Sequence, residues 1–164
     1  PGPCAAVTAL VKSGFPSSKF IFEGFLPKKK SDREKTLLQI SKNEKTTILF
    51  ESPNRLKKLL FELKEHLGGE KEIQISRELT KMFEEQIGNN IDEVINYFEG
   101  KEILGEITIV IKGRDKTKEK LASNKIYLKQ ELVDLVHAGL SLSKASSYLA
   151  KKSNLPKSEI YNLY

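Results

Sequence analysis

The fold class is decided by the stretch Thr46-Thr47-Ile48-Leu49-Phe50-Glu51-Ser52-Pro53. Residues 46–50 are a short apolar run of the kind that forms a buried strand. Ser52 is a favoured helix N-cap residue, and Pro53 then takes the first helical position, where its missing N–H costs nothing. The stretch therefore predicts a strand that leads directly into a helix.

The same alternation of strand and helix patterns continues on both sides of this stretch. The helix that begins at Pro53 stops at Gly68-Gly69 and carries apolar residues at helical spacing: Leu56, Leu59, Leu60, Leu63 and Leu67. Further helices are predicted at 3–13, from a cap at Asp32, and at 91–98, and strands at 19–26, 72–77, 83–87 and 106–111. Strands separated by helices predict an α/β sheet with flanking helices, and the short loop before 83–87 predicts a mixed sheet.

The last part of the chain differs in charge and in pattern. Residues 114–164 hold 10 basic and 5 acidic side chains, whereas residues 1–113 hold 18 and 17. Three short helices are expected there: residues 124–138, a helix capped by Ser141 or Ser143, and one opened by Ser158. The sequence thus predicts a body at 1–113, a polar linker at 114–123 and a helix-turn-helix-like module at 124–164. A basic module beside a near-neutral body suggests RNA binding, although a solvated basic surface is the alternative.

Composition limits the class of protein. The chain has 164 residues, 38% of them hydrophobic, which is enough for a core. No apolar run approaches the length of a membrane span. The single cysteine excludes an internal disulfide framework and suits a cytoplasmic protein. Neither Cys4 nor the two histidines, His66 and His137, show ligand spacing, so no metal site is expected.

The first residues predict a ligand site at a helix N-terminus. Pro1-Gly2-Pro3 is typical of a tight turn that feeds an Ala-rich helix, whose first backbone N–H groups are free for a polar ligand group. Such a site is rarely the start of a natural protein. We therefore expect the chain to be the C-terminal part of a longer enzyme, with half of the active site elsewhere.

Five ordered motifs carry a resemblance that spans nearly the whole chain. They are Pro1-Gly2-Pro3-Cys4-Ala5-Ala6, Phe22-Glu23-Gly24-Phe25-Leu26-Pro27, Phe50-Glu51-Ser52-Pro53-Asn54-Arg55, Arg77-Glu78-Leu79-Thr80-Lys81, and Gly105-Glu106 before an apolar strand. In this order and spacing the chain resembles the ribosomal RNA small subunit methyltransferase I family of the tetrapyrrole methylase superfamily. The resemblance implies the C-terminal half of that fold, without the N-terminal domain and its glycine-rich cofactor loops.

The resemblance also implies an activity and its partners. The expected reaction is S-adenosylmethionine-dependent 2′-O-methylation of a cytidine ribose in small-subunit (16S) ribosomal RNA, by a homodimer built through the catalytic domain. This chain alone is expected to bind the cofactor weakly and to be inactive. Two alternatives stay open: another methylase of the superfamily, acting on a tetrapyrrole or on a modified amino acid of a translation factor, and a non-catalytic nucleic-acid-binding protein.

The resemblance assigns cofactor contacts to strand ends and turns, where ligands of α/β sheets collect. The expected cofactor-binding residues are Cys4, Ala5, Phe50, Glu51, Arg77, Glu78, Leu79, Gly105 and Glu106. Ordinary ion pairing at strand ends is the alternative for Glu51, Arg55, Arg77 and Glu78. A simple turn is the alternative for Gly105, and a small buried side chain is the alternative for Cys4.

The catalytic and RNA-binding candidates rest on side-chain chemistry. The general base is not identified, and Glu51, Glu78 and Lys81 are candidates for it. The RNA-binding candidates are Lys28, Lys29, Lys30, Arg33, Arg55, Lys144, Lys151, Lys152 and Lys157. The first four are expected in a loop between a strand and a helix, where they either hold phosphates or are merely solvated.

Overall fold

The computed structural model describes residues 4–164, and within 116–123 it describes the backbone alone. The chain divides into two compact units after Arg114. We call residues 4–114 the body and residues 115–164 the tail, and each is described by itself. The predicted roles of these units, as a methylase subdomain and a helix-turn-helix-like module, stay predictions.

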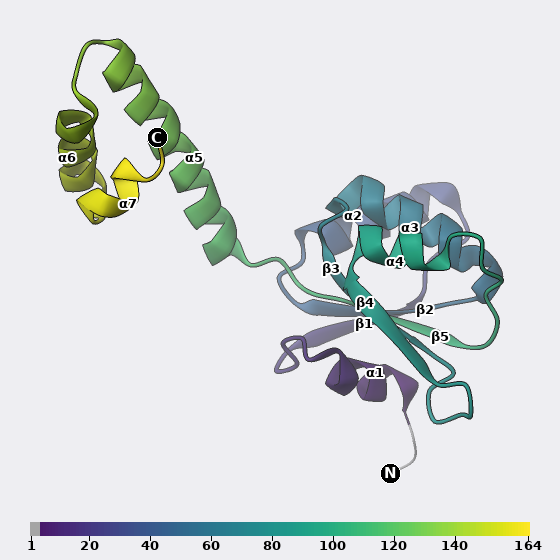
Figure 1. The fold of residues 1–164 in the computed structure, drawn as a ribbon. Coiled ribbons are helices and arrows are strands. Elements are labelled where there is room, and N and C mark those ends of the chain that lie inside the picture. Colours follow the sequence, from purple (N-terminus) through teal and green to yellow (C-terminus); the bar gives the residue numbers. More distant parts are fainter. Residues whose placement is uncertain (1–3) are drawn as a thin grey trace. The chain divides into compact units, whose positions relative to one another are not determined.

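The body is built on one mixed sheet (Figure 1). Its five strands lie in the order β1-β2-β5-β3-β4, and their bounds are β1 (Phe20–Phe25), β2 (Thr46–Glu51), β3 (Glu72–Arg77), β4 (Glu85–Asn90) and β5 (Ile107–Ile111). β1 and β2 pair in parallel, and the other neighbours pair antiparallel. The predicted mixed α/β sheet is confirmed.

Helices cover both faces of this sheet (Figure 1). α2 (Lys30–Lys42), α3 (Pro53–Leu67) and α4 (Ile91–Phe98) lie on one face, and α1 (Ala5–Ser13) lies on the other. The alternation of β2 serves both layers, because Leu49 joins the core under α2–α4 while Ile48 packs with Ala9 and Leu10 of α1. Helical spacing therefore predicted the buried face of α3 correctly, since Leu56, Leu59, Leu60 and Leu63 are all buried.

Strand direction brings distant motifs to one edge of the sheet. β2 and β3 are both antiparallel to β5, so they run in the same direction and end where β5 begins. Glu51 at the end of β2 and Arg77 at the end of β3 are both register partners of Ile107. The motifs at 50–55, 77–81 and 105–106 therefore meet at this edge, although they are far apart in the sequence.

A β-bulge gives the edge strand β1 an unusual face. The register shifts between Phe22, which pairs with Ile48, and Gly24, which pairs with Leu49 and has a φ of 64°. One extra residue there keeps Phe22 and Phe25 on the same face of the sheet, on the side of α1. α1 packs on β2, β3 and β5, and the rings of β1 stay exposed.

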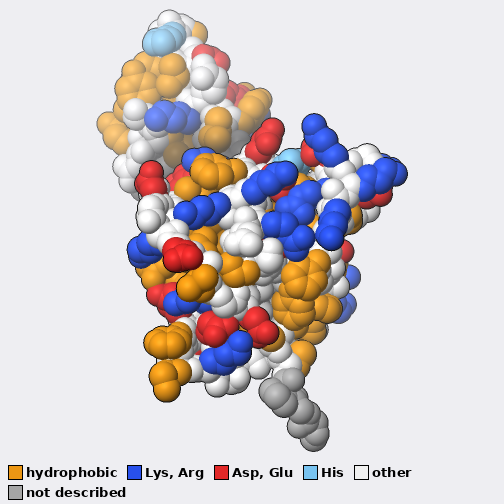
Figure 2. Space-filling model, turned by 90° about the vertical axis from the view of Figure 1, so that its right-hand side faces the viewer, with side chains coloured by type: hydrophobic (Ala, Val, Ile, Leu, Met, Phe, Trp, Pro, Cys, Tyr) orange, Lys and Arg blue, Asp and Glu red, His pale blue; other side chains and the backbone are white. Residues whose placement is uncertain are grey.

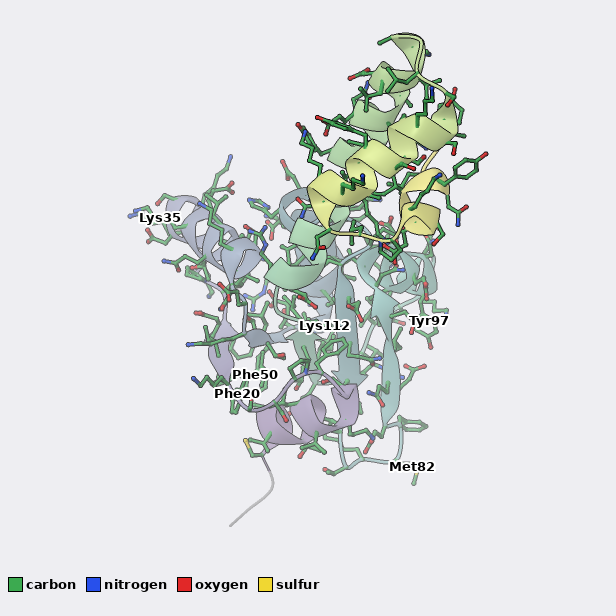
Figure 3. All side chains as sticks on the ribbon, turned by 90° about the vertical axis from the view of Figure 1, so that its left-hand side faces the viewer. Phe20, Lys35, Phe50, Met82, Tyr97 and Lys112 are labelled. Carbon is green, nitrogen blue, oxygen red and sulfur yellow. The ribbon has the colours of Figure 1, made fainter. Side chains whose placement is uncertain are left out.

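Several predicted boundaries in the body are wrong. The N-cap of α2 is Lys29, and Asp32 lies in the first helical turn, where its carboxylate still favours the helix dipole. Lys30 and Arg33 consequently belong to the helix and not to a loop. The strand predicted at 83–87 begins at Glu85, because turn hydrogen bonds hold residues 78–84. Met82 lies at the tip of this turn and is 90% exposed (Figure 3). The predicted role of Pro3 as first helical residue lies outside the described residues.

The tail consists of three helices: α5 (Lys116–His137), α6 (Leu142–Ser153) and α7 (Lys157–Tyr161). The linker predicted at 114–123 is wrong from Lys116 onward, where α5 already runs; lysine, glutamate and alanine, which fill this segment, are good helix formers. Ser141 is the N-cap of α6, as one of the two predicted options had it, but Pro156 and not Ser158 precedes α7. The helices share a core of Leu128, Leu132, Ala145, Leu149 and Ile160.

No helix among the described residues combines the length and the apolar character that a membrane crossing requires. In the same part of the chain, no three His, Cys, Asp or Glu side chains are grouped so that they could hold a metal ion.

His66 joins α2 to α3, and its hydrogen bonds predict that the stability of the body depends on pH. Its Nδ1 lies 2.8 Å from the Glu62 carbonyl oxygen and its Nε2 lies 2.9 Å from Glu34 Oε1. The hydrogen bond to the Glu62 backbone, followed by the one to Glu34, raises the pKa of His66 above its ordinary value. A raised pKa means that the folded state binds the proton more tightly, so this stabilisation is present at low pH and is lost as pH rises through the folded-state pKa.

We therefore expect the unfolding temperature to fall between about pH 6 and about pH 8, and His66→Gln to flatten that dependence. Unfolding temperatures of both proteins measured across this range test it. An equally steep dependence in His66→Gln would assign the titration to another group.

Candidate functional site

A pocket of about 430 Å³ opens at the sheet edge where β2 ends and β5 begins. It is lined by Ala5, Phe25, Phe50, Glu51, Ser52, Pro53, Gly105, Glu106, Ile107 and Thr108. Its size and its mixture of apolar and aromatic walls with a few polar groups are typical of small-molecule sites. All of these residues belong to the body.

One wall is the start of α1. Ala5 is the first helical residue, and Cys4 before it is an extended N-cap whose side chain makes no capping hydrogen bond. The small Ala5 side chain keeps the pocket open beside the free N–H groups of the first turn. Cys4 is exposed, so its alternative interpretation as a small buried residue is wrong.

A second wall is aromatic. The Phe50 ring packs edge-on against Phe25, with centroids 5.9 Å apart, and against Phe22, with centroids 5.0 Å apart. The guanidinium of Arg55 lies 5.9 Å from the centre of the Phe25 ring. Phe22 and Phe25 of β1 thus both contact Phe50, which lies on β2; Figure 3 labels Phe50 together with Phe20 of β1. This wall can cover the flat face of a ring system.

Glu51 forms the buried base of a charge network behind this wall. Its side chain is 1% exposed. Oε1 accepts hydrogen bonds from the backbone N–H of Ser52 and from Nε of Arg55, both at 2.7 Å, while Oε2 lies 3.9 Å from Arg33. Arg33 also binds Glu62 at 2.6 Å. Ion pairing at the strand end, the alternative for Glu51 and Arg55, is what the structure contains, and it leaves Glu51 little access to a substrate proton.

The third wall is a turn held by Glu78. The backbone N–H of Glu78 donates to the Glu106 carbonyl at 2.9 Å, and the N–H of Glu106 donates back to Glu78 Oε1 at 2.8 Å. Lys81 donates to the same oxygen at 3.0 Å and lies 3.2 Å from the Glu106 carboxylate. Glu78 has a φ of 52°, a left-handed conformation that a side chain disfavours and that functional turns often hold.

This turn also bears on the choice of general base. The hydrogen bond from the Glu106 backbone, and then that from Lys81, lower the pKa of the Glu78 carboxyl. Hydrogen bonds to Glu78 and Glu106 raise the pKa of Lys81. Both side chains are therefore held in their charged forms. A carboxylate with a lowered pKa is a weak base and a protonated lysine is none, so this geometry favours positioning roles for the pair.

The pocket unites five of the nine predicted cofactor-binding residues: Ala5, Phe50, Glu51, Gly105 and Glu106. Glu78 lies outside the pocket lining but accepts a hydrogen bond from the backbone N–H of Glu106, which belongs to the lining. Arg77 binds Glu85 at 2.9 Å and the Leu104 carbonyl at 3.3 Å, and Leu79 packs in the core under α1. The cofactor roles of all nine stay predictions.

Sequence reasoning missed Phe25, Ser52, Pro53, Ile107 and Thr108 as pocket residues. Ser52 and Pro53 were interpreted as a helix start within a family motif, but they were not named as cofactor-binding residues. The register of β5 against β2, which brings in Ile107 and Thr108, leaves no mark in one sequence. Phe25 lies within a motif of the family resemblance, and this was the available signal.

The predicted RNA-binding residues lie in different settings. Lys28, Lys29 and Lys30 are exposed at the start of α2, whereas the Arg33 side chain is only 14% exposed and paired with Glu62. Figure 2 shows Lys and Arg side chains gathered on one face of the body beside a hydrophobic patch. In the tail, Lys144 and Lys151 are exposed, Lys152 pairs with Glu131, and Lys157 donates to the Ser143 hydroxyl at 2.8 Å.

Gly105 is required by the contact with Glu78. A Cβ at Gly105 would lie 2.5 Å from Cγ of Glu78, and the φ of Gly105 is 91°. We expect Gly105→Ala to cost about 1–2 kcal/mol for the backbone conformation alone, with a further loss from displacing Glu78. Gly100→Ala is the matched control, since its φ is 68° and a Cβ there meets nothing within 4 Å. Urea unfolding measures both losses, and equal losses would remove the steric role of Glu78.

The body shares its fold with solved methyltransferases. The methyltransferase CobJ matches with a TM-score of 0.54 at 16% identity, covering 69% of this chain and 49% of that protein. Cobalt precorrin-4 methyltransferase, CbiF, matches with a TM-score of 0.52 at 15% identity, covering 68% and 50%. The chain therefore shares its fold with these methyltransferases, over about half of their length.

Sequence relatives narrow the class to a family. The chain is 36% identical over 163 residues to Ribosomal RNA small subunit methyltransferase I of Synechocystis sp., covering 99% of this chain and 58% of the relative. It is 37% identical to the protein of the same name from Vibrio cholerae, covering 98% and 56%, and 44% identical over 115 residues to that of Thermotoga maritima, covering 70% and 51%. No family model matches the chain.

The chain belongs to the ribosomal RNA small subunit methyltransferase I family, and the resemblance found in its motifs is confirmed. It spans about half the length of the curated relatives that it matches.

Proposed function

We propose that this chain supplies one half of an S-adenosylmethionine site, namely the pocket described above. We propose further that it acts in the 2′-O-methylation of a cytidine in 16S ribosomal RNA, in the cytoplasm. The observation that carries the proposal is the pocket at the meeting point of β2 and β5. Its lining includes five of the residues to which the family resemblance assigns cofactor contacts. The relatives' name supports ribosomal RNA as substrate. The choice of ribose 2′-oxygen and of cytidine rests on the family resemblance.

The residues of the pocket fit such a cofactor. The Phe25 and Phe50 rings suit the adenine ring, and Ser52, Thr108 and the first N–H groups of α1 offer polar contacts for the ribose or the amino-acid end. The cofactor would supply a methyl group on a sulfonium sulfur, which is the chemistry that methylation of a ribose hydroxyl requires. The role of this chain is to bind and orient the reactants, since orientation provides much of the rate in such a transfer.

Methyl transfer tests the proposal directly. Clefts between domains take ligand groups from both walls, so we expect the 164-residue chain alone to transfer no methyl groups. A chimera that joins this chain to the part of the Vibrio cholerae relative outside the match should transfer labelled methyl groups to small ribosomal subunits. Nucleoside analysis of the product should yield 2′-O-methylcytidine. A base-methylated nucleoside would contradict the proposed position, and transfer to a tetrapyrrole instead of RNA would favour the other methylase.

The tail is proposed to hold RNA phosphates through Lys144 and Lys151, which are both exposed. Reversing these two charges should lower RNA affinity at low salt and reduce the log-affinity against log-salt slope by about 1.5, at about 0.7–0.9 per phosphate contact. Lys152 is a poor choice for this test, because a glutamate there would face Glu131. Reversing the exposed Lys42 and Lys45 of the body is the control for net charge.

Binding titrations across a salt series measure both slopes. If the two double variants lost RNA affinity equally, the tail would contribute to RNA binding only through the overall charge of the protein. The predicted homodimer is a separate proposal, which light scattering of this chain and of the chimera tests.

A further inference from the structure

Three phenylalanines on β1 form an exposed aromatic face that the pocket does not explain. Phe20, Phe22 and Phe25 are 41%, 50% and 59% exposed. The bulge at Gly24 puts Phe22 and Phe25 on one face of the sheet, and the alternation of the strand adds Phe20 to it. We call these three residues the β1 aromatic face. Exposed rings so close together on an edge strand are costly in water and indicate a binding surface.

The rings are held in place from below. Phe50 packs edge-on against both Phe22 and Phe25. These contacts restrict the two exposed rings and so lower the ordering cost of stacking a ligand on them. Phe25 and Phe50 also line the pocket, so the β1 aromatic face continues directly into the candidate cofactor site.

Cations stand at both ends of this face. Lys19 precedes β1, and Lys28 and Lys30 follow it, all three exposed, while the Arg55 guanidinium lies 5.9 Å from the Phe25 ring centre. Lys29 is paired at 3.8 Å with Asp32, and Glu23 is an exposed acid within the strand. The strand of six residues covers roughly 20 Å at about 3.3 Å per residue, which is the length of a few nucleotides.

We infer that the β1 aromatic face binds unstacked bases of single-stranded RNA, with the adjoining lysines holding the phosphates. Aromatic side chains flanked by basic ones are the recurring platform for single strands, because each base offers a flat face and the phosphates need cations. A second copy of this chain is the less favoured occupant, since a twofold contact would bring the same lysines towards one another. The inference rests on the proposed RNA substrate and adds where its single-stranded part lies.

A tryptophan reporter tests the inference, because the chain contains no tryptophan. Phe22 is the position of choice, as it belongs to the face without lining the pocket. In Phe22→Trp, a short single-stranded RNA should quench the fluorescence, and a duplex of the same sequence should quench it far less. Phe61→Trp on α3, at a site that is 60% exposed, should stay unquenched. Phe22→Ala should weaken single-strand affinity about 10-fold, and Phe22→Tyr should retain it.

Either of two results in the RNA titrations would overturn the inference. One is salt-dependent RNA binding that leaves the fluorescence of Phe22→Trp unquenched and is insensitive to Phe22→Ala, and the other is no binding of the single strand at all. Conversion of a dimer to a monomer by Phe22→Ala, with RNA affinity unchanged, would likewise overturn it and make the face a contact between copies. Methyl transfer by the chimera is measured separately. If the chimera transfers methyl groups but RNA does not quench Phe22→Trp, only this inference is contradicted. If RNA quenches Phe22→Trp but the chimera transfers no methyl groups, only the proposed function is contradicted.

Discussion

Glu51→Ala is expected to destabilise the body by about 2 kcal/mol, because it removes a buried acceptor of charge-assisted hydrogen bonds, which are worth about 1.5–3 kcal/mol. In the parent protein, Arg55 Nε and the backbone N–H of Ser52 both donate to Glu51 Oε1 at 2.7 Å. The change removes the acceptor of both hydrogen bonds. Arg33 keeps Glu62, which holds the loss near the lower end of the usual range. Urea unfolding of the parent and the variant measures the difference.

Two further variants separate burial from charge. Glu51→Gln keeps an acceptor for Ser52 and should cost less than Glu51→Ala. Glu72→Ala breaks the pair with Lys112, in which Glu72 is 53% exposed, and should cost less than about 1 kcal/mol. If Glu51→Ala cost no more than Glu72→Ala, the network at the base of the pocket would not be a structural unit.

Ala5→Leu should lower the affinity of the chimera for S-adenosylmethionine by at least about 10-fold, which corresponds to about 1.4 kcal/mol. Ala5 is the first residue of α1 and lines the pocket, so the added carbon atoms would occupy the space of the ligand. Val11→Leu is the matched control on the same helix, since Val11 is 72% exposed and lies outside the pocket lining. Calorimetric titrations give both affinities.

Stability should be almost unchanged in Ala5→Leu, because Ala5 is exposed and leucine is a good helix former. An unchanged cofactor affinity in a folded Ala5→Leu protein would place the cofactor elsewhere.

Local signals predicted the elements whose ends are marked in the chain. Ser52-Pro53 and Gly68 bound α3 as expected, and residues 72–77, which were predicted as a strand, form β3. Asp32 was wrongly predicted as the N-cap of α2, because an acidic residue is favourable in the first helical turn as well as at the cap position. Residues 116–123 look like a linker by polarity, yet a polar segment of good helix formers extends α5.

The site was predicted less completely than the fold, because it depends on register and on a bulge. The family motifs placed Phe50, Glu51 and Gly105 at one edge. Nothing in the local sequence signals that Gly105, besides lining the pocket, packs against the Glu78 side chain, since this depends on a hydrogen-bonded turn between distant segments. The β1 aromatic face was missed for a similar reason, because strict alternation would have put Phe22 and Phe25 on opposite faces.

We propose that the pocket where β2 ends and β5 begins holds S-adenosylmethionine. Photolabelling of the chimera with a light-activated analogue of the cofactor, followed by peptide mapping, tests this most directly. We expect label within residues 50–53 or 105–108, and we expect this label to be lost when unmodified cofactor competes. Competed label confined to the groove between α3 and α4, which is lined by Phe61 and Phe98, or to residues of the relative's own part alone, would contradict it.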